Sequence, residues 1–451
     1  MKRTLFFRCI TPLCLPALAM PAIAAVEIDL GVTSRYSDNA RRTYSDKISE
    51  RQDEYSAGIL ADYENSLLDF ETDYRASENR FDKETQPDRS LIEGNAELLI
   101  GKAHHPVDLL LVHSRRSVLG APDQVDLLQN EDERQIFSAI PTARLRLSRV
   151  DNVLLRGDYT QVDFRYTDIF NSERTGGSLI WQHRFSSVSN LEVAAQHTEI
   201  SYDALPNNDY EYQNASVTFA TELRYLSYRV SLGYNQSTPE VGEDFSAPSY
   251  RVEIDYRSGF NTLSLLASQQ ITDTSLGDGN QGMLDNVNLD DATGVGLDQF
   301  ESRVVELRWD NESLCERCNA YASLLYEQEQ YQTLIEDNDQ NVASIGFDYQ
   351  LSRASSVGLQ ASRQERKFDS DVDRNDFTVT SFGANYRYTF INDLSVQLFF
   401  IVDDNGFIIL RGRQFITYFI ATDLIQLKVI TVFTFRGDIP FNDHIIGDGS
   451  C

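Results

Sequence analysis

Apolar and polar side chains alternate along most of the chain with a period of two residues. Between Leu68 and Arg75, an apolar or aromatic side chain alternates with a charged one at nearly every step. Residues 250–257 and 305–309 repeat this pattern, and no stretch of comparable length shows a helical period. Because successive side chains of a strand point to opposite faces, the pattern predicts a long series of β-strands with one apolar and one charged face.

The connections between these segments alternate in length. Short turns are expected near 65–66, 149–152, 186–190, 257–261, 352–355 and 391–393. Longer polar connections are expected near 78–89, 115–134, 203–210, 236–247, 272–298, 331–338 and 367–374. Bacterial outer-membrane barrels have short periplasmic turns and longer outer loops, and the spacing gives about 20 strands, with a range of roughly 18–22. The predicted fold is therefore an all-β, single transmembrane antiparallel up-and-down β-barrel.

The alternation alone also fits a soluble β-protein, such as a periplasmic propeller or solenoid, but no fixed repeat of the kind these folds need is present. Aromatic side chains recur at strand ends, as membrane interfaces require: Tyr63, Trp181, Tyr256, Trp309, Tyr349 and Tyr388. The charged faces suit a hydrated lumen in which acids and bases mix. The residues predicted to line it are Asp69, Glu71, Asp73, Arg75, Arg144, Arg146, Arg251, Glu253, Asp255, Arg257, Glu306 and Arg308.

Composition narrows the function classes. The 451 residues contain 69 acidic and 40 basic side chains, for a net charge of -29. Such an acidic chain is not a general nucleic-acid binder, and its lumen is expected to favour neutral or cationic cargo. Beyond residue 25 the longest unbroken apolar run is Leu398–Val402, far shorter than the ~20 residues of a membrane-spanning helix.

The N-terminus predicts export. Lys2, Arg3 and Arg8 precede an apolar stretch, and Ala22-Ile23-Ala24 resembles a cleavage site, so residues 1–24 are interpreted as a signal peptide, with Ala25 as the alternative cut. The expected location is the bacterial outer membrane. There the barrel, residues 25–435, would contact lipid and depend on the barrel assembly machinery during biogenesis.

The cysteines agree with export. Cys315-Glu-Arg-Cys318 could suggest zinc or redox chemistry, but a zinc site needs further ligands that the sequence does not supply nearby. In an oxidising compartment a local disulfide between Cys315 and Cys318 is the expected outcome. No cofactor and no metal is predicted.

The last part of the chain departs from the preceding pattern. From Ile401 onward isoleucine becomes frequent, tyrosine becomes rare and alternation is less regular. A closing strand that ends at Phe435, followed by a polar tail at 436–451, is one expectation. A shift of reading frame near residue 400 and an atypical closing hairpin are the two explanations for the change.

The strand-level motifs resemble a known family. The mature start, residues 26–39, ends in Tyr36-Ser37-Asp38-Asn39, and hairpins such as LRLSRVDNVLLRGDY and YRYTFINDLSVQLFF join aromatic strand ends to short turns. Over residues 26–400 these resemble the outer-membrane β-barrel porin family associated with exopolysaccharide gene clusters, including PEP-CTERM (exosortase) loci. The resemblance implies a non-enzymatic channel or scaffold in exopolysaccharide export, with the polymer and periplasmic export machinery as partners. It supplies no catalytic residues.

Two other functions remain open from the sequence. A general diffusion porin for small solutes would be supported by an inward-folded loop, for which residues 272–298, the longest connection, are the candidate. A rim-located hydrolase acting on lipid or polysaccharide would need serine, histidine and acid together. His197 near Glu199 is only a fragment of such a site, because the sequence displays no complete cluster of serine, histidine and acid. A lone histidine of this kind is more often structural, so the chain is predicted not to be an enzyme.

Overall fold

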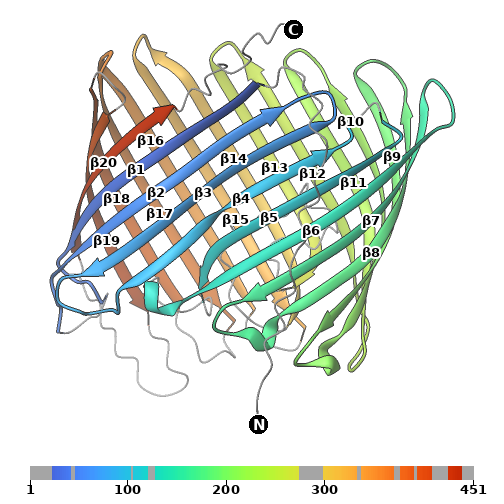
Figure 1. Ribbon diagram of the computed structural model, residues 1–451, viewed down its shortest axis with the longest axis horizontal. Coiled ribbons are helices and arrows are strands. Elements are labelled where there is room, and N and C mark those ends of the chain that lie inside the picture. The colour runs from blue at the N-terminus through green and yellow to red at the C-terminus, as the bar shows by residue number, and fades with distance from the viewer. Residues whose placement is uncertain are drawn as a thin grey trace, which may run out of the picture.

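The computed structural model describes residues 23–41, 46–102, 105–119, 127–273, 298–332, 337–369, 376–390, 394–408 and 425–438. These residues form a 20-stranded sheet that closes into a barrel of steeply tilted strands (Figure 1). Residues 1–22 of the predicted signal peptide, most of the connection 272–298 and residues 439–451 of the predicted tail lie outside the described residues, whereas Ile23 and Ala24 belong to the first strand and residues 436–438 to the last. The reading frame near residue 400 is a question for the gene and stays a hypothesis.

The first ten strands are β1 (Ile23–Ser37), β2 (Glu50–Glu64), β3 (Leu68–Phe81), β4 (Arg89–Ile100), β5 (Val107–Leu119), β6 (Glu131–Arg146), β7 (Asp151–Phe164), β8 (Ser172–Arg184), β9 (Ser189–Tyr202) and β10 (Tyr210–Glu222). The second ten are β11 (Leu226–Pro239), β12 (Phe245–Ser258), β13 (Asn261–Asp273), β14 (Gln299–Cys315), β15 (Cys318–Tyr331), β16 (Asn338–Ser352), β17 (Ser355–Phe368), β18 (Asp376–Thr389), β19 (Leu394–Ile408) and β20 (Ile425–Asp438).

Each strand pairs antiparallel with its neighbours in the chain, and β1 also pairs with β20, from Glu27 opposite Asp438 to Ser37 opposite Lys428. Closure pairs the first and last of the described strands with each other, and so removes the two long edges that an open sheet of this size would expose. The predicted all-β, antiparallel up-and-down barrel with about 20 strands is confirmed. The closing strand β20 ends at Asp438 instead of the expected Phe435.

The two ends of the barrel differ. The end reached by the short connections, such as 65–67 and 259–260, is called here the short-turn end, and the opposite one the long-loop end. Asn65 shows how a short turn is fixed: its Oδ1 accepts hydrogen bonds from the backbone N–H groups of Leu67 and Leu68, both at 2.7 Å. The 3₁₀ helices η1 (Leu128–Asn130), η2 (Asp168–Phe170) and η3 (Pro206–Asn208) lie at the long-loop end, at the bottom of Figure 1.

A repeated device shapes the long-loop end. The last aromatic residue of an outgoing strand faces the barrel interior, and its backbone N–H donates to an Asp or Asn side chain six to eight residues further on. The pairs are Phe81 with Asp88, Phe164 with Asn171, Tyr202 with Asp209, Tyr331 with Asp337, and Phe368 with Asp376. Each acceptor satisfies an N–H that the ending ladder leaves unpaired, so the strand ends curl inward and stay ordered.

The outward face carries the apolar side chains. Leu30, Leu155, Leu232 and Leu324 are each at least half exposed, an arrangement that suits contact with lipid chains and would be costly in water. No helix within the described ranges is long and apolar enough to cross a membrane.

Aromatic residues border this apolar face at both ends. Tyr63, Trp181, Tyr256, Trp309, Tyr349 and Tyr388 all lie near the short-turn ends of their strands. Tyr36, Tyr55, Tyr234 and Tyr326 lie near the long-loop ends. On β2, Tyr55 and Tyr63 are separated by about 27 Å along the strand, or roughly 20 Å of height at a tilt of about 40°. This spacing is close to the ~25 Å apolar band of transmembrane barrels.

Candidate functional site

The charged residues predicted for the lumen all occur on the strand faces opposite the exposed apolar side chains. Antiparallel partners share a face, so the register places Arg75 with Gly58 and Asp29, and Arg308 with Ser264. The set is Asp69, Glu71, Asp73, Arg75, Arg144, Arg146, Arg251, Glu253, Asp255, Arg257, Glu306 and Arg308.

Several of these side chains form ion pairs along the inner wall. Arg75 lies 2.9 Å from Asp29, Arg144 lies 2.9 Å from Asp108, Arg251 lies 2.6 Å from Glu253, and Arg308 lies 2.7 Å from Asp310. Asp69 lies 3.9 Å from Lys102. In these pairs acids and bases neutralise one another locally.

The seam between β12 and β13 is open at the long-loop end. Pairing of these strands stops at Tyr250 opposite Gln269, whereas β13 continues to pair with β14 as far as Asp273 opposite Gln299. Beyond the seam, consecutive residues are buried on both faces: Ile271, Thr272 and Asp273 are 1%, 0% and 1% exposed. A strand in the wall would keep one face open to lipid. The ends of β13 and β14 therefore leave the wall and lie inside the barrel.

An ion pair holds the inward end of β13 against a distant part of the wall. The Arg174 guanidinium of β8 donates to both carboxylate oxygens of Asp273, at 2.9 and 2.7 Å, and the Tyr210 hydroxyl of β10 donates to the same carboxylate. The Arg174 and Asp273 side chains are 3% and 1% exposed. Strands β8 and β13 are separated in the sheet by β9 to β12, so this contact lies inside the barrel and joins two parts of the wall that do not adjoin. We call Arg174, Tyr210 and Asp273 the latch.

Apolar packing supports the latch. Ile271 is buried in a cluster with Ile200, Tyr202, Tyr212 and Ala247, all of them on β9, β10 and β12. Burial of one such side chain contributes about 1.5–3 kcal/mol. The inward end is thus held by apolar packing of Ile271 together with the buried charged contact of Asp273.

Two cavities flank the latch. On its short-turn side a cavity of about 630 Å³ extends over β7 to β13 and is lined by hydroxyl and amide groups together with Arg156, Arg229, Arg251, Glu192 and Glu253. On its long-loop side a cavity of about 550 Å³ is lined by Tyr202 and Tyr210 and by the start of β14.

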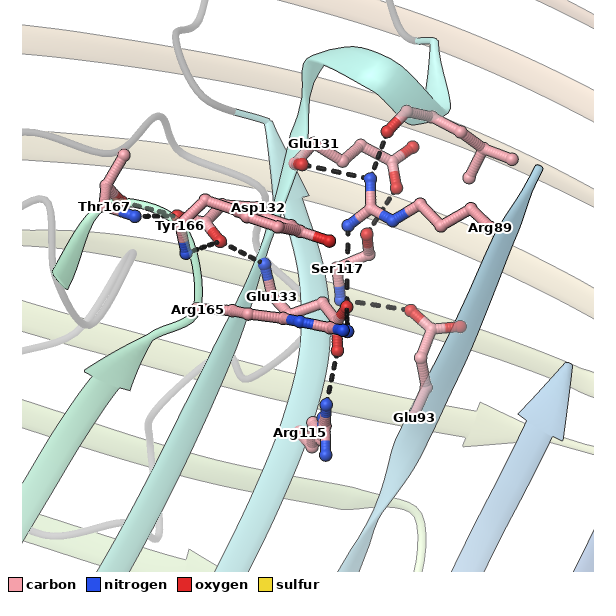
Figure 2. Close-up of polar contacts among 11 residues, drawn as sticks. Arg89, Glu93, Arg115, Ser117, Glu131, Asp132, Glu133, Arg165, Tyr166 and Thr167 are labelled. Atoms are coloured by element: carbon pink, nitrogen blue, oxygen red, sulfur yellow. Dashed lines mark hydrogen bonds and ion pairs between the residues drawn. The ribbon is translucent and has the colours of Figure 1, made fainter. Parts of the chain in front are cut away.

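Ion pairs link the strands at a second seam, between β4 and β5. Strands β4 and β5 pair only from Gly94 opposite Arg115 to Ile100 opposite Leu109, so they diverge towards the long-loop end. Figure 2 shows side chains converging there on Glu133, which is 3% exposed. Arg115 Nη2 lies 2.5 Å from the carboxylate, Arg165 also pairs with it, and an Arg89 Nη lies 3.8 Å away. The carboxylate raises the pKa of the Arg165 guanidinium, which stays charged.

Neighbouring bonds complete this cluster. The Ser117 backbone N–H donates to Glu93 Oε1 at 3.1 Å, which joins β5 to β4 beyond the last ladder pair. Asp132 accepts the backbone N–H groups of Tyr166 and Thr167, both at 3.0 Å, and so holds the β7–β8 connection beside the cluster (Figure 2). The cluster replaces missing backbone pairing with side-chain contacts, which is a structural role.

Gly94 marks the point where β4 and β5 separate, and a side chain there would be incompatible with the fold. Its φ is +152°, and a Cβ would lie 2.2 Å from the Asp73 carbonyl oxygen and 2.6 Å from Tyr74 Cα. Gly94→Ala is expected to lower the free energy of unfolding by about 1–3 kcal/mol, measured by urea titration in detergent. Gly58→Ala is the control, because its Cβ would meet nothing nearer than 3.5 Å. Equal losses in the two variants would contradict this account.

Other sequence candidates lie away from the lumen. Cys315 and Cys318 are joined by a disulfide at the two-residue turn between β14 and β15. His197 lies on the outward face, 3.8 Å from Glu199, and both side chains are well exposed. Arg174, Tyr210, Asp273 and Glu133 were not predicted from the sequence as functional residues.

The fold and the lumen together define a transmembrane β-barrel whose interior is narrowed by part of its own wall. The sequence matches no protein family, and no curated protein matches it. Among solved structures, the chain resembles a loop-deletion mutant of OmpT, an outer-membrane protein of Vibrio cholerae (9% identity, 92% of this chain, 99% of that chain, TM-score 0.38). It also resembles Pseudomonas aeruginosa OccK2 (OpdF) in complex with glucuronate (8%, 92%, 98%, TM-score 0.41) and OpdK with vanillate (9%, 92%, 99%, TM-score 0.40). At these values the resemblance adds nothing to what the barrel itself establishes.

Proposed function

We propose that the protein is a passive channel of the bacterial outer membrane for small hydrophilic solutes. The contact of Arg174 with Asp273 across the lumen carries this proposal. It holds the ends of β13 and β14 inside the barrel, where they narrow the path between the two polar cavities. The short turns would face the periplasm and the long loops the outside, as in other barrels of this type.

The narrowing favours small solutes over a polymer. An export channel for exopolysaccharide would need a continuous path along which many sugar units pass, and the latch lies within that path. The role in exopolysaccharide export that the family resemblance implies is therefore the less favoured proposal. A link to PEP-CTERM loci remains a prediction from sequence.

The inner wall suits a neutral or mixed-charge path. Cross-lumen and along-wall ion pairs leave hydroxyl and amide groups as the main partners for a solute, as in the cavity of about 630 Å³. Such groups exchange hydrogen bonds with water and solute at little net cost, which favours passage over tight retention. The charged lumen residues named from the sequence would contribute as ion pairs of mixed sign along this path.

Liposome swelling with sugars of increasing size tests the proposal. Refolded protein in liposomes should admit monosaccharides and disaccharides and exclude long oligosaccharides, and planar bilayers should show stable open channels. Folding is checked by heat-modifiable migration on gels. Passage of polysaccharide would favour the export role, whereas a folded barrel without conductance would contradict both channel functions.

A further inference from the structure

The cavity on the long-loop side of the latch has an unusual set of lining groups. Its volume is about 550 Å³, and Tyr210 of the latch forms part of its floor. The β11–β12 connection contributes Glu243 and Asp244, and the segment leading into β14 contributes Asp298 and Gln299. Gln332, in the connection between β15 and β16, donates from Nε2 to the Glu243 carbonyl oxygen at 2.8 Å and so links that connection to the one between β11 and β12.

The charge of this cavity has one sign. Glu243, Asp244 and Asp298 are acidic, and the described residues that line the cavity include no lysine, arginine or histidine. The cavity on the other side of the latch, in contrast, carries Arg156, Arg229 and Arg251 beside its acids. A concave, acidic site attracts cations and concentrates them at its mouth.

Gln299 provides an independent indication of a ligand. Its side chain is 7% exposed, yet its Oε1 accepts no hydrogen bond from any residue that the structure describes. A buried acceptor without a partner costs about 1–3 kcal/mol. A donor group on a bound solute would remove that cost, because Gln299 lines the cavity.

The spacing of the acidic side chains favours an organic cation over a divalent metal ion. Within the described residues, no three Asp, Glu, His or Cys side chains lie close enough together to hold one metal ion. A divalent metal needs several oxygen ligands at 2.3–2.6 Å or less. An organic cation with separated ammonium groups meets acceptors that lie apart, and its N–H groups can also reach the Gln299 carbonyl oxygen.

We propose that this cavity, lined by Glu243, Asp244, Asp298 and Gln299, is a recognition site for small organic polyamine-like cations. This inference rests on the proposed channel function and names the solute class that the channel would admit from the long-loop side. The Gln299 carbonyl oxygen and the acidic side chains of the two connections bind the cation, and the latch separates it from the cavity of about 630 Å³.

Three four-carbon probes of equal length test the charge selectivity: putrescine, butane-1,4-diol and succinate. Isothermal titration calorimetry on the full-length folded protein should detect binding of putrescine alone. In planar bilayers putrescine should interrupt the current when it is added on the long-loop side. Binding of succinate or of Mg²⁺ as strong as that of putrescine would overturn the proposal.

The variants identify the site. Glu243→Gln/Asp244→Asn changes exposed residues of a connection and should weaken putrescine binding by at least about tenfold. Gln299→Leu should weaken it as well, provided that the barrel folds. Glu240→Gln removes one charge from the same connection outside the cavity and should leave binding unchanged. If the channel conducts and is size-limited but does not bind putrescine, this inference fails and the proposed function stands. If the protein binds putrescine but shows no conductance, the proposed channel function fails and the binding site stands.

Discussion

Asp273→Ala is expected to raise the single-channel conductance at least about twofold, because conductance follows the narrowest part of the path. The substitution removes the carboxylate that holds the inward end of β13 and leaves the Arg174 guanidinium buried without its partner. Breaking a buried pair in this way costs about 3–5 kcal/mol. This exceeds the about 1.5–3 kcal/mol that burial of Ile271 contributes, so apolar packing alone should not keep the end in place.

The barrel itself should survive this change. The β13 end pairs with β14 up to Asp273, and β14 pairs with β15 from Phe300 onward, so the ladder does not depend on the latch. Heat-modifiable migration of Asp273→Ala should therefore resemble that of the parent protein. The conductance histogram in planar bilayers gives the measurement.

Two controls separate the latch from a general loss of charge. Asp108→Ala breaks the 2.9 Å pair with Arg144, which joins the neighbouring strands β5 and β6 and crosses no lumen, so the conductance should stay the same. Arg174→Met/Asp273→Leu replaces both charges with apolar groups of similar size, an exchange that often preserves packing. Its conductance should remain near that of the parent. A folded Asp273→Ala channel with unchanged conductance would contradict the narrowing role of the latch.

The barrel could be predicted from the sequence because every strand contributes the same local signal. Alternation over 68–75 or 250–257 fixes which face of a strand is apolar, and closure follows from the number of strands. Strands that follow one another in the chain pair with each other, and side chains alternate between the two faces of each strand. Once the apolar, outward face is known, the inward-facing residues are known as well.

The latch could not be predicted, because it depends on where β13 leaves β12. One signal was present: Gln269 and Asp273 occupy positions that would face lipid if β13 continued in the wall, and both are polar. Although Ile271 between them is apolar, polar residues at two of the three outward positions are costly in a membrane. They indicate a strand end that has left the lipid, but they do not identify Arg174 as the residue it contacts, since contacts across the lumen have no sequence period.

The burial of Glu133 could not be predicted from the sequence either. Glu133 continues the outward face of β6 beyond the membrane zone, where a charge is ordinary, and only the divergence of β4 from β5 explains why it is buried. Sequence patterns predict strands that stay paired, but they do not show where the pairing of two strands stops. The latch and the ion pairs around Glu133 both occur where pairing stops.

Glu133→Gln is expected to lower the free energy of unfolding by about 3 kcal/mol, because it leaves the Arg89, Arg115 and Arg165 guanidinium groups around a neutral amide. The ladder between β4 and β5 ends at Gly94, so beyond it the seam depends on side-chain contacts, of which the bond between Ser117 and Glu93 remains in the variant. Urea titration in detergent micelles gives the free energy. Amide exchange at Ser117, whose N–H bonds to Glu93 across the seam, should accelerate in the variant.

Glu78→Gln is the matched control for this loss. Glu78 lies 3.8 Å from Arg80, and the two side chains are 39% and 63% exposed, so its removal should cost no more than about 1 kcal/mol. The two variants should also differ in salt: screening acts on the exposed pair and little on a carboxylate that is 3% exposed. Conductance should not change in Glu133→Gln, because the seam belongs to the wall. Equal destabilisation of the two variants, or an altered conductance, would contradict the role of Glu133 as the closure of this seam.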